Sequence, residues 1–250
     1  MSQTTRWLAI GSSVAMLCCL GAAQQSSPKK TISLNSIVEA LERAQEAVRP
    51  QVSYQVVREY RLFGTKDSGA DSEVVAEIDF RPPARWDYRI QRSSGSHRGP
   101  QVVQRVLEHE SERASRNNQA RNALIRENYD FSYIGEAILD HQPCYLLQLK
   151  PRRRDPELIS GQAWVDEHSF LVRHIEGELA KSPSWWLKNV RVKLTFANVD
   201  GTWLQTGMEA VADVRIGGTH TLISRVLDFR SAGEVAFAKP ATRSATRNHP

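Results

Sequence analysis

The sequence contains few cysteines and none of the short motifs that mark common enzymes. Three cysteines occur among 250 residues, which is too few for a disulfide scaffold or for a zinc site with four cysteine ligands. No glycine-rich nucleotide loop, no G-x-S-x-G nucleophile and no H-E-x-x-H zinc motif is present. We therefore predict no catalytic residue, no metal ligand and no cofactor, and we expect a protein that is not an enzyme.

The seven histidines are scattered along the chain, without neighbouring ligands at metal-binding spacing. Asp166, Glu167 and His168 come closest to a metal or acid–base group. They lie between two expected strands, where polar turn residues are the ordinary explanation. A secreted hydrolase stays an alternative from a different class, but it would need a nucleophile or an acid pair that converges in one pocket.

Long apolar runs are also missing, except at the N-terminus, so a polytopic membrane protein is excluded. Trp7–Leu20 is mostly apolar, follows Arg6 and precedes three small residues. This order is typical of a secretory signal. We predict a signal peptide over residues 1–23, a linker over residues 24–32 and a periplasmic mature protein.

Two alternatives to cleavage stay open: an uncleaved anchor and lipidation. Lys29 and Lys30 could flank an anchor, although the apolar run is short for a bilayer span. Cys18 and Cys19 end the run, but the residues before them are too large for a lipidation signal. Cleavage would leave Cys144 as the one cysteine, in a stretch that predicts a buried strand start.

Composition and charge further limit the class of protein and the partners that it could bind. With 40% hydrophobic and 24% charged residues the chain is ordinary for a globular protein, which excludes wholesale disorder. The net charge is +5, but export argues against nucleic acid as a partner. The cationic stretch Pro151–Asp155 is either a solvated loop or a contact for lipid headgroups or an acidic protein.

Alternation of polar and apolar residues predicts a sheet over most of the chain. Val52–Leu62, Val74–Phe80 and Arg85–Gln91 each have one apolar and one polar face, as an antiparallel meander requires. We expect further strands at Tyr129–Ile134, Cys144–Lys150, Gln162–Asp166, Phe170–Glu176, Val190–Ala197, Trp203–Ile216 and His220–Phe229.

Two regions show helical spacing instead. Ser33–Val48 repeats apolar residues at intervals of three and four, and Pro50 ends the pattern. Val102–Arg126 has two apolar stripes around a charged middle, which predicts two helices or one broken helix lying on the sheet.

Together these patterns predict an α+β fold over residues 33–235. Its main element is a strongly curved antiparallel sheet, an incomplete β-barrel of about ten strands, covered by two or three helices. The tail, residues 236–250, is polar and is expected to be disordered. One apolar face on so many strands indicates that the sheet encloses helices, a ligand or both.

The inward faces of the first three strands carry our candidate ligand-binding residues. They are Tyr54, Val56, Arg58, Tyr60, Ile78, Trp86, Tyr88 and Ile90. Arg58 is the unusual member, because a guanidinium on an apolar face needs a partner or must reach water. It either anchors an anionic or carbonyl-bearing ligand or extends to the surface. Trp185 and Trp186 lie in an expected loop, where one could seal the barrel mouth or contact a partner or membrane.

Two hairpins resemble those of the LolA/LolB-like superfamily, in particular its outer membrane lipoprotein-sorting proteins. Gly161–Asp166 and Val172–Gly177 are similar to the family's W-V-D strand, turn and R-I-E strand. Asn198–Leu204 is similar to the turn before its G-x-W-L-P strand, although Gln205 replaces the proline. The first hairpin also has Glu167–Leu171 in place of the frequent T-G-L-P. The likeness covers roughly residues 33–232.

The resemblance implies a soluble carrier that binds lipoprotein acyl chains or other lipids under helices that form a lid. An inner-membrane transporter and an outer-membrane receptor would be its partners. Arg58 is the candidate for the arginine with which family carriers steady the lid. The alternative is a periplasmic binding or sensing module of the same fold that regulates a membrane-protein partner.

Overall fold

The computed structural model describes residues 32–64, 70–83, 85–115, 119–215 and 217–231. The predicted signal peptide, the predicted tail and all of the predicted linker except Ile32 lie outside the described residues. Among the described residues, no helix has both the length and the apolar character needed to cross a bilayer.

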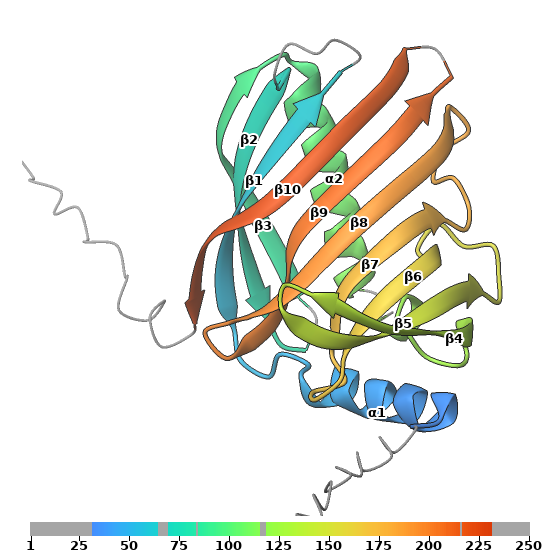
Figure 1. Cartoon of the computed structure of the whole chain (residues 1–250). Helices are drawn as coiled ribbons and strands as arrows, with labels where there is room; N and C mark the ends of the chain where they lie inside the picture. The colour runs from blue at the N-terminus through green and yellow to red at the C-terminus, as the bar shows by residue number, and fades with distance from the viewer. Residues whose placement is uncertain (1–31, 65–69, 84, 116–118, 216, 232–250) are drawn as a thin grey trace, which may run out of the picture. The chain divides into compact units, whose positions relative to one another are not determined.

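Ten antiparallel strands form one sheet, in the order β3-β2-β1-β10-β9-β8-β7-β6-β5-β4 (Figure 1). The first strand pairs with the last, and every other pair of neighbours is consecutive in the chain. The strands are β1 (Tyr54–Phe63), β2 (Ser72–Arg81), β3 (Arg85–Gly95), β4 (Tyr129–Leu139), β5 (Gln142–Pro151), β6 (Ile159–Asp166), β7 (Val172–Leu179), β8 (Leu187–Val199), β9 (Thr202–Val214) and β10 (Gly218–Ser231). Because β3 and β4 remain edges, the sheet is open, which confirms the predicted α+β fold.

Helix α1 (Leu34–Ala47) matches the helix predicted over Ser33–Val48. The Ser33 hydroxyl caps its first turn by accepting a hydrogen bond from the Ser36 amide at 3.1 Å. Ile37, Val38 and Leu41 are spaced for one helical face, and all three are buried.

Helix α2 (Arg98–Ser115) lies against β1, β2 and β3. It begins four residues before the predicted start at Val102, and Pro100 lies in its first turn. Proline is compatible with a first helical turn, where its missing amide hydrogen has no intrahelical partner.

The second helix expected before Arg126 does not form, which corrects the two-helix reading of that region. Gln119–Arg121 is a single 3-10 turn, and turns continue to Asn128. The side-chain amide nitrogen of the buried Asn128 donates hydrogen bonds to the carbonyls of Ala120 and Ala123, both at 2.7 Å. These side-chain bonds take up carbonyls that helical hydrogen bonds would otherwise use.

One face of the sheet, called the inner face here, holds two apolar cores. The α1 core combines Ile37 and Leu41 of α1 with buried side chains of β4–β8, among them Leu147, Ala163 and Val192. The α2 core combines Val103 and Leu107 of α2 with buried side chains of β1, β2, β9 and β10.

The opposite, outer face is polar, as the alternation in the sequence predicted. On this face Glu59 accepts a hydrogen bond from Arg225 at 2.6 Å, and Glu77 is paired with Arg89 and Gln91. Both carboxylates are buried beneath these longer side chains. The strands therefore bury apolar residues on one side and satisfied charges on the other.

Candidate functional site

The eight candidate residues of the first three strands all lie on the inner face. Val56 pairs with Ile78, and Ile78 pairs with Tyr88, so the three strands present one continuous apolar surface. Tyr54, Val56, Tyr60 and Ile78 are buried in the α2 core, and Trp86, Tyr88 and Ile90 are half-buried against it. The structure thus brings the predicted residues together, under helix α2.

Arg58 is also on the inner face and is 8% exposed. It does not extend to the surface. Its Nη1 donates to the Ser224 hydroxyl at 3.4 Å, and its Nη2 donates to the Gln205 carbonyl. Its Nε finds no hydrogen-bond partner among the described residues. Arg58 therefore links β1, β9 and β10, and its Nε–H group is left as an unused hydrogen-bond donor.

The tyrosines beside Arg58 lie in a poorly hydrated setting. Burial raises the pKa of Tyr54 to about 12, with Arg58 lowering it and Glu110 of α2 raising it. Burial likewise raises the pKa of Tyr60, whose hydroxyl finds no partner among the described residues. Two unsatisfied polar atoms, Arg58 Nε and Tyr60 Oη, thus lie on one strand beneath α2.

Helix α2 covers this surface with little apolar area of its own. Val103 and Leu107 are buried and Val106 is half-buried, whereas much of the rest of the helix is polar. Its first turn approaches the sheet closely, since a Cβ on Gly99 would clash with the Ser72 side chain. Near its other end Ser111 donates to the Trp86 carbonyl at 2.8 Å. Contacts near both ends of the helix therefore hold α2 on the sheet.

The inner face of the central strands holds apolar side chains that the sequence did not single out as a site. We call them the central strip: Leu194 and Phe196 of β8, Met208 and Ala210 of β9, and Val226 of β10. Leu194 pairs with Met208, so the strip joins the two cores. Its members are only half-buried, although they face the same side as the buried residues.

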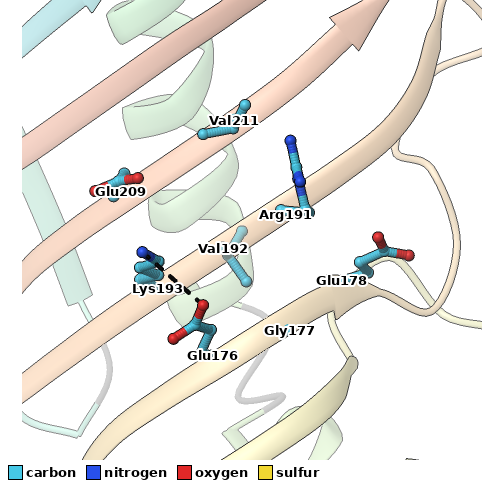
Figure 2. Close-up of a pocket in the computed structure, with 8 residues that line it drawn as sticks. All are labelled: Glu176, Gly177, Glu178, Arg191, Val192, Lys193, Glu209 and Val211. Carbon is cyan, nitrogen blue, oxygen red and sulfur yellow. Dashed lines mark ion pairs between the residues drawn. The ribbon is translucent and has the colours of Figure 1, made fainter.

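A hollow of about 340 Å³ lies over β7, β8 and β9 (Figure 2). Its lining residues are Glu176, Gly177, Glu178, Arg191, Val192, Lys193, Glu209 and Val211. Lys193 pairs with Glu176 at 3.9 Å, and in Figure 2 helix α2 lies behind the strands that carry these charges. Because three acids and two bases line this hollow, it favours water and ions over an apolar ligand.

The cationic stretch Pro151–Asp155 has a structural use. Arg153 donates to the Asn128 side-chain oxygen and to the Arg121 carbonyl, both at 2.6 Å. Arg152 donates to the Arg126 carbonyl at 2.9 Å. Two of the three arginines therefore fasten the 119–128 segment to β5.

The Asp166 turn is likewise explained by local bonds. The Asp166 carboxylate accepts hydrogen bonds from the amides of His168 and Ser169 at 3.0 and 2.8 Å. Burial alone would raise the pKa of Asp166, but these bonds and the Arg173 charge hold it below its usual value. Among the residues that the structure describes, no group of three His, Cys, Asp or Glu side chains could hold a metal. Cys144 is buried, as predicted.

Comparisons with known proteins add the following. No family model matches the chain, and no curated protein matches it. Among solved structures it is similar to a DUF1329 family protein from Desulfovibrio piger, with 17% identity, a TM-score of 0.41, and 81% of this chain and 94% of that one covered.

Two further solved structures are named after the groups that the two hairpins resemble. A putative outer membrane lipoprotein-sorting protein domain from Vibrio parahaemolyticus has 14% identity and a TM-score of 0.41, with 78% of this chain and 92% of that one covered. A LolA superfamily protein from Nitrosomonas europaea has 14% identity and a TM-score of 0.35, with 80% and 94% covered. The proteins that this chain is similar to thus include members of the superfamily that its hairpin motifs resemble.

Proposed function

We propose that the protein is an exported carrier that binds lipoprotein acyl chains or other lipids on its inner face and moves them through the periplasm. The observation that carries this proposal is the half-burial of the central strip, which lies between the fully buried side chains of the two cores. Apolar side chains left half-covered on the inside of a curved sheet favour an apolar ligand, at about 0.8 kcal/mol for each methylene group buried.

Helix α2 supplies the access route in this proposal. Its displacement would uncover Tyr54, Tyr60, Trp86 and Tyr88, and would join their surface to the central strip. The same movement would leave the two unsatisfied donors on β1, Arg58 Nε and Tyr60 Oη, free to bind the carbonyl or acid group of a lipid. The eight candidate residues would then contact cargo only while the helix is away.

Uptake of a fluorescent fatty acid and of a fluorescent lipopeptide tests the proposal, with the chain from Gln24 onward. Removal of residues 1–23 takes away no residue of the described fold. We expect saturable binding of at least one of the two probes. If neither probe binds, the carrier function is wrong, and stable capture of a membrane-protein partner would then favour the binding or sensing module.

A matched pair of substitutions on β9 tests where the cargo lies. Ala210→Trp places a large side chain on the inner face, between Val192 and Leu222. We expect it to displace about two methylene groups of the cargo and to weaken fatty-acid binding roughly tenfold in a fluorescence titration.

Val211→Trp is the control, because Val211 is the next residue of the same strand and lies on the outer face, between Arg191 and Thr221. It should leave binding unchanged. Thermal unfolding of both variants shows whether each is folded. Equal binding by the two folded variants would exclude the central strip as the cargo site.

A further inference from the structure

The connection between β7 and β8 exposes two adjacent tryptophans. Trp185 is 83% exposed and Trp186 is 38% exposed. Trp185 is the most exposed of the large hydrophobic side chains that the structure describes at the surface. An indole in water exposes a large apolar area, and Trp side chains favour places where one end is apolar and the other is wet.

This connection is firmly held. The Ser182 hydroxyl donates to the Leu187 carbonyl at 2.8 Å, and the Leu187 amide donates to the Ser184 carbonyl at 3.2 Å. Arg215, directly after β9, donates from Nε to the Trp185 carbonyl at 2.6 Å and from its backbone amide to the Trp186 carbonyl at 2.9 Å. The tryptophans are therefore presented by an ordered turn, so binding through them costs little ordering entropy.

The segments that carry and hold the two indoles contain cations but no carboxylate. Residues 180–190 contain Lys181 and Lys188, and residues 214–224 contain Arg215, without an acidic residue in either segment. All three cations are exposed. The nearest carboxylates along the chain are Glu178 and Asp213, and Asp213 already accepts a hydrogen bond from Thr219 at 2.8 Å.

We propose that the Trp loop, residues 180–188 together with Arg215, docks the protein on a bilayer surface that carries anionic lipid headgroups. Indole rings settle at the boundary between headgroups and acyl chains, and cations beside them attract anionic lipid. A projecting aromatic turn within a cationic rim has the chemistry of an interfacial anchor. This inference does not depend on the carrier function, because it concerns the loop and not the inner face.

In Figure 1 the loop lies beside the β9–β10 turn, at the end of the sheet away from α1. Docking there would leave α1, the edge strand β4 and the outer face of β1–β3 in water. It would also bring the neighbouring ends of β7, β8 and β9 to the membrane surface.

Sedimentation with vesicles tests the proposal, with the chain from Gln24 onward so that the apolar N-terminal run does not contribute. Vesicles of phosphatidylcholine alone are compared with vesicles that also contain phosphatidylglycerol. We expect binding to the mixed vesicles, and a loss of about tenfold in partitioning for Trp185→Ala. Lys181→Gln and Lys188→Gln should each cost about fivefold, and less in high salt.

Two variants elsewhere serve as matched controls. Ile138→Ala removes another strongly exposed apolar side chain, which is 77% exposed on β4. Lys150→Gln removes an exposed cation from β5. Both should bind the mixed vesicles as the unchanged chain does, and circular dichroism shows whether every variant is folded.

Three outcomes would overturn the proposal. They are failure of the unchanged chain to sediment with mixed vesicles, equal sedimentation of Trp185→Ala, and sedimentation that is indifferent to phosphatidylglycerol. Loss of a stable protein partner by Trp185→Ala, without vesicle binding by the unchanged chain, would assign the loop to a protein interface instead. Vesicle binding without fatty-acid uptake would leave the docking surface standing while the carrier function failed.

Discussion

Leu107→Ala should loosen helix α2 from the sheet before the rest of the fold is affected. Leu107 is 1% exposed and is one of three aliphatic side chains that hold the helix on the α2 core. Truncation of a buried leucine costs about 2–5 kcal/mol, through lost transfer energy and a residual cavity. Because Val103 and Leu107 are the helix side chains fully buried in this core, the substitution removes a large part of the contact that holds α2 on the sheet.

Hydrogen exchange measured on peptides from α2 and from the strands distinguishes local release from global unfolding. In Leu107→Ala we expect the α2 amides to lose protection while β5 and β6 keep theirs, and the uptake of fluorescent fatty acid to become faster.

Leu147→Ala is the matched control. Leu147 is 0% exposed in the α1 core, between β4 and β6, and is not part of the core that helix α2 covers. Its truncation should lower the free energy of unfolding by a similar amount without selective exchange in α2. If the α2 amides stay as well protected as those of the strands in Leu107→Ala, the helix is a fixed part of the core and not a movable cover.

Much of the sheet could be predicted because the strands bury apolar side chains mainly on one face. Where Val74, Ala76, Ile78 and Phe80 alternate with polar residues, period two appears directly in the sequence, and β2 (Ser72–Arg81) extends the predicted strand by only a few residues. The alternation of apolar and polar residues is weaker in the edge strand β4. In β4 the residues after Ile134 include the exposed Glu136 and Ile138, so no buried apolar face marks this part of the strand in the sequence. The strand therefore continues five residues beyond its predicted end, to Leu139.

The candidate site was predictable only in part, because its contacts are non-local. The sequence places Arg58 on an apolar face, but its partners Ser224 and Gln205 come from strands near the end of the chain. Likewise, the inward direction of Leu194 and Phe196 follows from alternation. Their half-burial depends on which strands the two helices cover, and this is a property of the assembled fold.

Asp155→Asn should destabilise the protein by about 2 kcal/mol at neutral pH, through the loss of charge-assisted hydrogen bonds. Asp155 is 3% exposed, and its carboxylate accepts bonds from Arg121 Nε at 2.9 Å, from Arg153 Nε at 3.3 Å and from the Glu157 amide at 3.0 Å. These bonds join the 119–128 segment to the connection between β5 and β6. The loss stays below that of a fully buried ion pair because both arginines can return to water.

The effect of this carboxylate depends on pH in a definite direction. Burial alone would raise the pKa of Asp155, but the Glu157 amide and the two arginines hold it below its usual value. A depressed pKa in the folded state means that the stabilisation is complete above the unfolded value of about 3.9 and is lost as pH falls through the folded one. Urea unfolding at a series of pH values should therefore show the difference between Asp155→Asn and the unchanged chain shrinking in strong acid.

Asp130→Asn provides the comparison, since Asp130 pairs with Arg152 at 3.3 Å in an exposed ion pair. Both side chains of that pair are more than half exposed, at 58% and 53%, so its removal should change stability by less than about 1 kcal/mol. Equal losses for the two substitutions would mean that the buried carboxylate contributes no more than a surface charge. A difference for Asp155→Asn that persists unchanged in strong acid would show that its effect comes from packing, because the carboxylate is then protonated and no longer pairs with the arginines as an anion.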